Sequence, residues 1–172
     1  QALADATRAT AWLQAGDPRI LGLARVAQRG SVDARMRRLA EAVRVRLAAG
    51  IAYDGFLDAR AAYDARRGDC TEYAVLLAAV ARARGIPTRV VAGLAYASRF
   101  IGTPHAFGPH MWVQAWDGQR WTSYDAALGQ FDAGHIALVV GDGDPQGMRG
   151  ALDLVRRLRI ADAAAIEPAV AR

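Results

Sequence analysis

The hydrophobic period changes midway along the chain, and this change restricts the folds that the chain can adopt. In the first half, apolar residues recur three or four positions apart, as they do on one face of an α-helix. From Arg89 onward, apolar and polar residues alternate in short runs, as they do in strands with one buried face. Helices followed by antiparallel strands are typical of the α+β class. The sequence therefore predicts an α+β fold, and 172 residues suffice for one domain with its own core.

Capping and breaker residues set the limits of the expected helices. Gly16-Asp17-Pro18 is a turn and breaker that ends the first helix. Ser31 stands at the N-cap position of the third helix, and Gly50 closes that helix. The expected helices span residues 3–14, 19–29, 32–47, 59–66 and 70–84.

The second half predicts an antiparallel sheet that packs on the alanine-rich face of helix 70–84. Asp117-Gly118 is a hairpin signal, because this pair adopts the positive φ angles of a two-residue type I′ turn. The expected strands span residues 89–97, 110–116, 119–125 and 135–140; residues 100–109 and 142–147 are expected to be loops, and 148–159 a helix or a helix leading into a strand.

The hairpin turn decides which residues of its two strands face each other. If the Asp-Gly pair occupies the two central positions, His110 pairs directly with Asp125 on one face, with Cβ atoms about 5 Å apart. If a four-residue loop is instead closed by Trp116 and Trp121, His110 lies diagonal to Asp125 by two residues. We favour the first register because of the Asp-Gly preference for type I′ turns.

Cys70 follows Gly68-Asp69 at the start of helix 70–84. Backbone N–H groups and the helix dipole favour an anion there, so the sequence predicts a lowered pKa for the thiol. The backbone N–H of Cys70 is also a candidate oxyanion donor. A lone cysteine is more often a small buried apolar residue. Together with a strand histidine and an opposing aspartate, however, it matches a nucleophile, a base and an orienting carboxylate.

Four motifs together resemble those of the bacterial transglutaminase-like superfamily, and the resemblance covers residues 55–141. They are RGDCTEYA (67–74) with RGIPTRVV (84–91), HMWVQ (110–114), WTSYD (121–125), and GQ with DAGHI (129–136). Two residues depart from the family pattern: Gln114 replaces a frequent acid, and Ala126 replaces a frequent proline after the aspartate.

The resemblance implies a papain-like core with a Cys–His–Asp triad. Cys70 is then the nucleophile, His110 the general base and acid, and Asp125 the orienting carboxylate. The implied enzyme is a cysteine-dependent acyltransferase, peptidase or amidase that acts on a carboxamide or peptide bond through a thioester, with hydrolysis and transamidation both open. The alternative is a non-catalytic peptide-binding or structural domain of a larger bacterial envelope protein.

Further residues lie near these motifs. Asp69 and Glu72 are expected to cap the helix and complement its dipole. His135 matches a family position for which no role follows from the sequence. The remaining candidates are Trp112 as part of the substrate groove, His105 at the border of the cleft, and Tyr53 or Tyr63 as a second oxyanion donor.

Composition excludes several classes of protein. The net charge of +5 comes from 22 scattered arginines with no lysine and no interleaved aromatic residues, so we expect no nucleic-acid partner. One cysteine and three histidines cannot form a Cys-rich zinc site, and we expect no metal or organic cofactor. No run approaches the roughly 18 apolar residues of a membrane span.

We expect residues 1–172 to form a single transglutaminase-like domain. It comprises a helical N-terminal region (1–50), the catalytic core (55–141) and a C-terminal extension (142–172). Because the sequence starts at Gln1 without a leader, we expect a processed chain or a part of a longer one. We also expect a peptide or protein substrate, and we favour a periplasmic or cell-envelope location over the cytoplasm.

Overall fold

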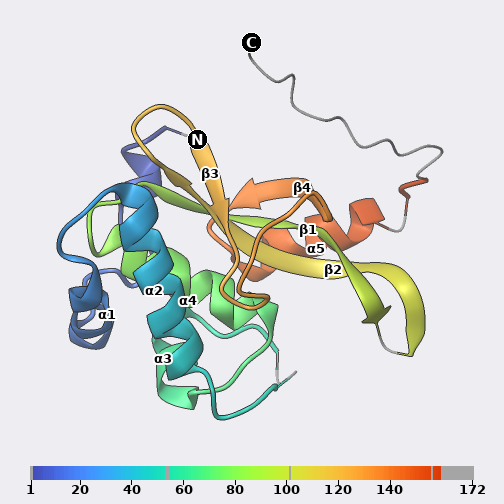
Figure 1. Cartoon of the computed structure of the whole chain (residues 1–172), viewed down its shortest axis with the longest axis horizontal. Coiled ribbons are helices and arrows are strands. Elements are labelled where there is room, and N and C mark those ends of the chain that lie inside the picture. Colours follow the sequence, from blue (N-terminus) through green and yellow to red (C-terminus); the bar gives the residue numbers. More distant parts are fainter. Residues whose placement is uncertain (1, 53–54, 101, 156, 160–172) are drawn as a thin grey trace.

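Four antiparallel strands form a sheet in the order β3-β2-β1-β4 (Figure 1). The computed structural model describes residues 2–52, 55–100, 102–155 and 157–159. The strands are β1 (Thr88–Phe100), β2 (Thr103–Trp116), β3 (Trp121–Tyr124) and β4 (His135–Gly141). Strands β1, β2 and β3 are neighbours in chain order, whereas β4 returns to the far edge of β1. The predicted α+β class is confirmed.

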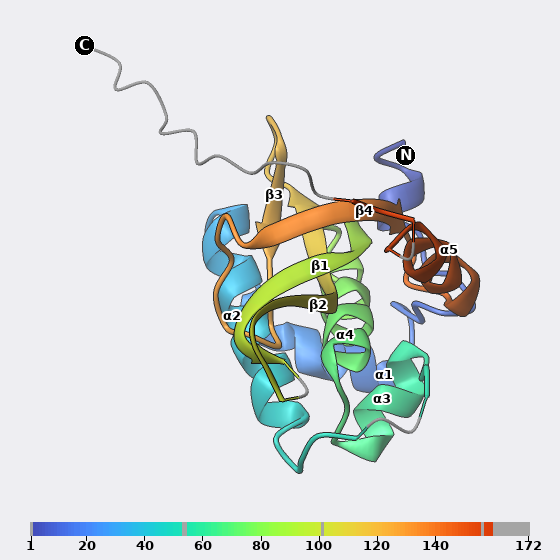
Figure 2. The same ribbon diagram turned by 90° about the vertical axis from the view of Figure 1, so that its right-hand side faces the viewer.

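Helix α4 is the centre of the helical layer and lies behind the sheet in Figure 2. Small residues such as Ala74, Ala78 and Ala81 are buried along it, so the helix approaches the strands closely. Helix α5 packs against β4 and β1. The helical elements are η1 (Asp5–Thr7), α1 (Pro18–Leu23), η2 (Ala24–Ala27), α2 (Val32–Arg46), α3 (Ala59–Ala65), α4 (Cys70–Arg82) and α5 (Pro145–Val155).

Asp17-Pro18 begins a helix, contrary to the prediction that it ends one. The side chain of Asp17 accepts the N–H of Arg19 at 2.9 Å, and Pro18 occupies the first helical position, where its missing N–H costs nothing. The expected helix 3–14 contains only the short turn η1. Leu13, one of the apolar residues of this segment, is nevertheless fully buried in the core.

Residues 100–109 do not form the predicted loop. Strands β1 and β2 continue as a long hairpin up to the pair Phe100 and Thr103. Pro104 and Pro109 lie in the part of β2 that pairs with β1 alone, because β3 pairs only with the last four residues of that strand.

The register of the second hairpin is the one that we did not favour: Trp116 pairs with Trp121. The carboxylate of Asp117 accepts the backbone N–H groups of the second and third residues after it, at 2.8 and 2.9 Å. Asp117 thus closes the turn through its side chain, and Gly118, with a φ of 111°, supplies the positive backbone angle. As a result Gln114, and not Trp112, lies opposite Ser123.

Gly93 allows β4 to approach the middle of β1. A Cβ atom at this position would lie 2.0 Å from the carbonyl oxygen of Ile136 and 2.9 Å from the ring of Trp112. The pairing of β1 with β4 changes register between Ala92 and Gly93. This close approach places His135, the first residue of β4, beside β2 side chains that belong to the candidate site.

The C-terminal part of the chain contains helix α5. Helix α5 begins at Pro145, earlier than expected, because Asp144 caps it by accepting two backbone N–H groups. The end of the expected C-terminal extension, residues 160–172, lies outside the described residues. Within the described part, no helix has the length and apolar character that crossing a membrane requires.

Candidate active site

The start of α4 meets β2 at an open pocket of about 480 Å³. Both Cys70 and His110 line this pocket, so the structure brings together two of the three residues expected to carry the chemistry. The third, Asp125, contacts His110 from outside the pocket. Much of the remaining lining is apolar or aromatic, and includes Ile51, Tyr73, Tyr96 and Leu128.

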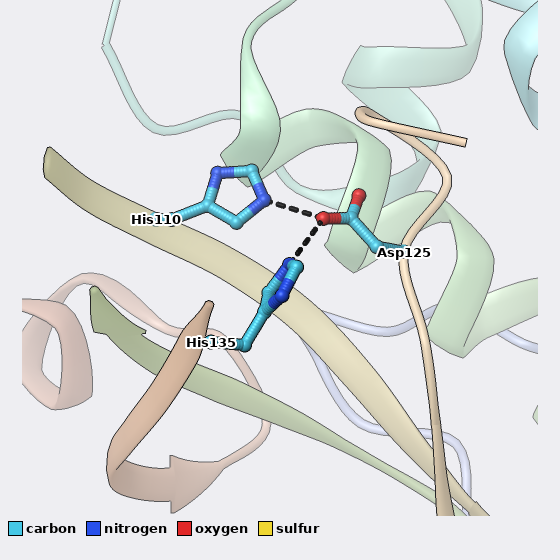
Figure 3. A group of neighbouring side chains, drawn as sticks. All are labelled: His110, Asp125 and His135. Carbon is cyan, nitrogen blue, oxygen red and sulfur yellow. Dashed lines mark hydrogen bonds and ion pairs between the residues drawn. The ribbon is translucent and has the colours of Figure 1, made fainter. Parts of the chain in front are cut away.

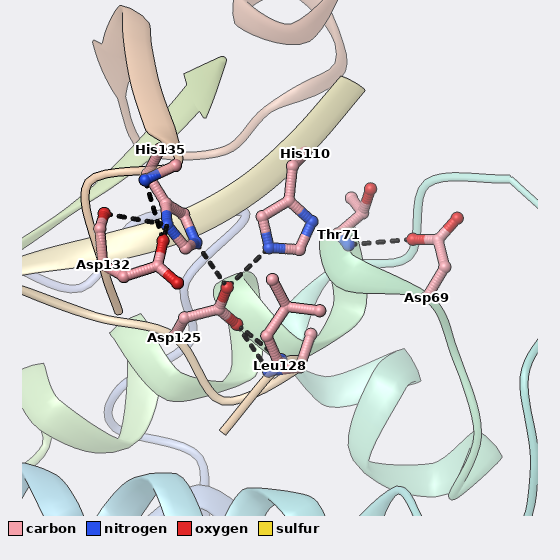
Figure 4. A network of polar contacts seen from close by, with 9 residues as sticks. Asp69, Thr71, His110, Asp125, Leu128, Asp132 and His135 are labelled. Atoms are coloured by element: carbon pink, nitrogen blue, oxygen red, sulfur yellow. Dashed lines mark hydrogen bonds and ion pairs between the residues drawn. The ribbon is translucent and has the colours of Figure 1, made fainter. Parts of the chain in front are cut away.

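The N-terminus of α4 is closed by a capping box. Asp69 accepts the N–H of Thr71 at 2.8 Å (Figure 4), and Glu72 accepts the N–H of Asp69 at 2.9 Å. The other oxygen of Glu72 accepts the N–H of Leu57 at 3.0 Å, which ties the preceding loop to the helix. Gly68 makes room for this carboxylate, because a Cβ atom there would lie 2.5 Å from that of Glu72. The predicted capping roles are confirmed.

The thiol of Cys70 lies in surroundings that disfavour a negative charge. Burial, together with the nearby charge of Asp69, raises its pKa to about 12, against a smaller lowering by a hydrogen bond from the backbone of Met111. The prediction of a lowered pKa is therefore wrong for this structure. The sequence argument counted the helix dipole, but not the carboxylates that cap the same helix end.

His110 and Asp125 form a short contact, 2.6 Å between Nε2 and Oδ2 (Figure 3). Burial raises the pKa of Asp125, but hydrogen bonds from His110, Leu128 and His135 outweigh burial and bring the pKa below its ordinary value. The other carboxylate oxygen accepts the N–H groups of Ala127 and Leu128 at 2.8 and 2.9 Å. Asp125 is thus an ionised carboxylate with both oxygens engaged.

The corrected hairpin register still brings His110 to Asp125. Strand β3 ends at Tyr124, which pairs with Val113, and the chain leaves the ladder at the next residue. The carboxylate can therefore reach back to the diagonal histidine. The second ring nitrogen of His110 points away from Asp125 and toward the start of α4, where Thr71 is drawn in Figure 4.

His135 is a third member of this group that sequence reasoning left without a role. Its Nε2 lies 3.1 Å from Oδ2 of Asp125, and its side chain is 2% exposed. The contact depends on the pairing of β4 with β1 across the sheet, which no local motif reveals. The available signal was the Asp-Ala-Gly turn before His135, in which Asp132 accepts the N–H of Gly134 at 2.9 Å.

Among the residues that the structure describes, His110, Asp125 and His135 form a group that could hold a cation, with one ligand atom from each lying within 4.8 Å of the others. Two imidazoles and a carboxylate are suitable ligands for zinc. Each of these side chains already has a hydrogen-bond partner within the group, however. The donor set is therefore satisfied without a metal.

Trp112 does not line the pocket, contrary to expectation. It is 1% exposed and lies beneath the two histidines, stacked on His110 at 6.2 Å between ring centroids and edge-on to His135 at 5.2 Å. Its indole Nε1 is buried without a hydrogen-bond partner. Trp112 therefore supports the imidazole rings from below and leaves the pocket to other side chains.

The remaining candidates lie away from Cys70 or outside the description. His105 is in the β1–β2 hairpin, where its Nδ1 is 2.6 Å from the hydroxyl of Tyr96, and that tyrosine, not His105, lines the pocket. Tyr63 lies in α3 with its ring 3.6 Å below the guanidinium of Arg46, so it belongs to the helical layer. Tyr53 lies outside the described residues.

Gln114, at the position of the frequent acid, has a structural role that a neutral side chain can perform. Its carbonyl oxygen accepts two hydrogen bonds from Arg89, at 2.8 and 3.0 Å, and its amide donates to Ser123 at 3.3 Å. The guanidinium of Arg89 also lies over the ring of Trp121 at 4.1 Å. This departure from the family pattern therefore affects the sheet and not the pocket.

The fold and the site define a class. A helix that begins at a cysteine packs on an antiparallel sheet, and that sheet carries a histidine hydrogen-bonded to a carboxylate; this is the papain-like arrangement. More specifically, the chain belongs to the transglutaminase-like superfamily, because residues 24–126 match the model of that family. The resemblance inferred from the motifs is confirmed.

Relatives and solved structures agree with this assignment. The protein-glutamine gamma-glutamyltransferase of Pseudomonas aeruginosa is 42% identical over 69 residues, which are 37% of this chain and 10% of that protein. A solved protein of Cytophaga hutchinsonii, provisionally called a cysteine protease, has a TM-score of 0.65 at 19% identity, covering 81% of this chain and 47% of that one. The periplasmic domain of TgpA from Pseudomonas aeruginosa, bound to ethylmercury, has a TM-score of 0.54 at 25% identity, covering 74% and 49%. The chain thus spans a tenth of the curated relative and about half of each solved chain.

Proposed function

We propose that this protein is a thiol-dependent acyltransferase or amidase that acts on carboxamide or peptide bonds, with Cys70 as nucleophile, His110 as acid and base, and Asp125 as orienting carboxylate. The observation that carries the proposal is the His110–Asp125 contact of 2.6 Å beside a pocket that Cys70 also lines. A buried carboxylate that holds one ring nitrogen leaves the other free to exchange a proton with the thiol.

The acylation step begins with a protonated thiol. As Sγ of Cys70 attacks the carbonyl carbon, the thiol proton passes to Nδ1 of His110. The carbon–nitrogen bond then breaks, and the imidazolium returns the same proton to the departing amine. The products are a thioester on Cys70 and a free amine or ammonia.

The thioester is resolved by a second nucleophile. His110 takes a proton from water or from an incoming amine as that molecule attacks the thioester carbonyl, and it returns the proton to the leaving sulfur. Water gives a carboxylic acid, and an amine gives a new amide. Both outcomes restore Cys70 as a thiol, so hydrolysis and transamidation share this site.

The electrostatics of the two sides support a base-assisted attack. A thiol whose pKa is about 12 is protonated at neutral pH and needs a base at the moment of attack. The ionised Asp125 stabilises the imidazolium that forms when His110 accepts the proton. One oxyanion donor is available as well, because the N–H of the first residue of a helix has no partner within that helix.

The setting of the activity is also part of the proposal, and the relatives support it. We propose a peptide or protein substrate, a catalytic core at residues 55–141 of a single domain 1–172, and further domains in a longer chain. TgpA, whose periplasmic domain resembles this fold, and the envelope location expected from the sequence support a periplasmic site of action. No nucleic-acid partner or cofactor enters the proposal.

The experiment measures alkylation of the thiol and two acyl-transfer products. Wild type, Cys70→Ala and His110→Ala are treated with iodoacetamide, and each is assayed with a glutamine peptide for ammonia release and for incorporation of a fluorescent amine. His105→Ala is the matched control, because His105 itself does not line the pocket. We expect both active-site variants to lose at least about 10³-fold in turnover. A His110→Ala protein that reacts like wild type in every assay would refute the proposal.

A further inference from the structure

His135 is a buried histidine that the proposed reaction does not use. It begins β4 at one edge of the sheet, whereas Asp125 directly follows β3 at the opposite edge. The segment between them crosses the sheet, and the 3.1 Å contact of His135 with Asp125 joins its two ends (Figure 3). Because His135 contacts Asp125 across this segment, it fixes the position of the Asp125 carboxylate.

Both ring nitrogens of His135 face acceptor oxygens. Nε2 faces Oδ2 of Asp125 at 3.1 Å, and Nδ1 lies 3.2 Å from both the main-chain oxygen and Oδ1 of Asp132 (Figure 4). The ring is therefore held from both sides, between Asp125 and Asp132.

The carboxylate of Asp125 is saturated with donors. Oδ2 receives His110 at 2.6 Å and His135 at 3.1 Å. Oδ1 receives the N–H groups of Ala127 and Leu128 at 2.8 and 2.9 Å. A carboxylate offers about four lone-pair positions, so four donors hold it in one orientation. Removal of His135 would free one of these positions.

We propose that His135 is a positioning residue: by its hydrogen bond to Oδ2 of Asp125, it holds the Asp125 carboxylate in the orientation that directs Nδ1 of His110 toward Cys70. This inference rests on the proposed function of the same site. His135 itself does not touch the substrate or the sulfur. It acts through Asp125 and lies beside His110, whose ring centroid is 5.7 Å away.

The ring of His135 is enclosed on all sides. Asp125 and Asp132 face its two nitrogens, and His110 lies beside it, while Trp112 and Phe131 cover its ring. Loss of the hydrogen bond from His135 leaves the Asp125 carboxylate free to turn, and Nδ1 of His110 is then held less firmly toward Cys70. A replacement that keeps a donor for Asp125 therefore preserves part of the reactivity of Cys70.

The test compares three variants that remove different parts of this arrangement. His135→Phe keeps a ring against Phe131 and Trp112 but removes both ring nitrogens. His135→Gln keeps one donor for Asp125. Asp132→Asn keeps the oxygen that accepts the N–H of Gly134 but removes the carboxylate facing Nδ1. Cys70 alkylation by iodoacetamide is followed from pH 5 to 10 in EDTA, with thermal unfolding as a folding check.

We expect alkylation at neutral pH to slow on the order of tenfold in His135→Phe, less in His135→Gln, which keeps a donor for Asp125, and least in Asp132→Asn. If His135→Phe fails to fold, the other two variants decide. Alkylation rates equal to wild type at every pH in folded His135 variants, while His110→Ala is slowed, would overturn this inference alone. A His110→Ala protein that labels like wild type would overturn the proposed function instead.

Discussion

The pKa values of acidic groups are raised at the helix end that carries Cys70, and the pKa of Asp125 is lowered on the sheet side that carries His110. At the start of α4, burial is the main reason that the pKa of the Cys70 thiol rises to about 12 and that of Glu72 to about 7. Across the pocket, four hydrogen-bond donors outweigh burial and lower the pKa of Asp125. Burial disfavours a negative charge on both groups, but donors surround Asp125, whereas carboxylates lie near Cys70.

In the proposed mechanism, this difference sets where the proton rests before a reaction. Among the described residues that line the pocket there is no arginine, although the chain contains 22 basic side chains. The cation proposed to stabilise a thiolate is therefore His110 itself, once it has taken the proton. On this proposal the helix side gives the proton and the sheet side receives it.

Removal of the charge on the sheet side should have the largest effect. In Asp125→Asn, the amide can still accept from one histidine but no longer stabilises the imidazolium or fixes its tautomer. We expect turnover of the glutamine peptide to fall on the order of 10³- to 10⁴-fold. Asp64→Asn, which removes an exposed carboxylate paired with Arg19, is the control and should retain full turnover. Turnover within tenfold of wild type in Asp125→Asn would show that the carboxylate is dispensable.

A second prediction concerns stability on the helix side. The pKa of Glu72 is raised from 4.5 to about 7, so the folded state binds this proton more tightly than the unfolded state does. Stability contributed by Glu72 is therefore present below about pH 4.5 and is lost as the pH rises toward 7. In Glu72→Gln this loss, on the order of 2 kcal/mol, should disappear.

Urea unfolding between pH 4 and 8 measures the effect of Glu72→Gln. The control is Glu41→Gln, because Glu41 is an exposed residue on α2 whose side chain is 69% accessible. It should leave the pH dependence of wild type unchanged. A Glu72→Gln protein with the same pH dependence as wild type would mean that Glu72 ionises in the folded protein as it does in water.

The smallest effect is expected from a substitution that lowers the pKa of Cys70. Asparagine caps helices about as well as aspartate, so Asp69→Asn should preserve the hydrogen bond to Thr71 while removing a charge beside the sulfur. The pKa of Cys70 should then fall below about 12, and iodoacetamide should react about threefold faster or more at pH 8. Asp58→Asn makes the same change at the start of α3 and should have no effect. Slower or unchanged alkylation in Asp69→Asn would assign the raised pKa to burial alone.

Local signals were enough to place the helix side of the site. Gly68-Asp69 before an apolar helical run correctly located the start of α4 at Cys70. The same kind of signal misled at Asp17-Pro18, because a pair that can stop one helix can equally cap the next. At Asp117, the side chain closes a four-residue loop, so Trp116 pairs with Trp121 and not with Gln119, two residues earlier, as the preference of an Asp-Gly pair for type I′ turns indicated.

The non-local part of the site could not be predicted. His135 meets Asp125 because β4 crosses to the far edge of β1, and no residue near His135 in sequence reveals that pairing. The pKa of Cys70 likewise depends on how deeply the helix end is buried beneath β2, which a dipole argument does not include. Motifs therefore identified the residue types, whereas packing determined their protonation.

The close backbone contact at Gly93 has a consequence for how such proteins diverge. A side chain at this position would meet the carbonyl oxygen of Ile136, and main chain cannot be repacked by a change of rotamer. Any accepted replacement must therefore displace β4, and with it the histidine that begins the strand. Relatives that have a histidine at the position of His135 should accordingly have a glycine at the position of Gly93. A search for proteins with the same site should therefore require both residues, because the histidine alone is less selective.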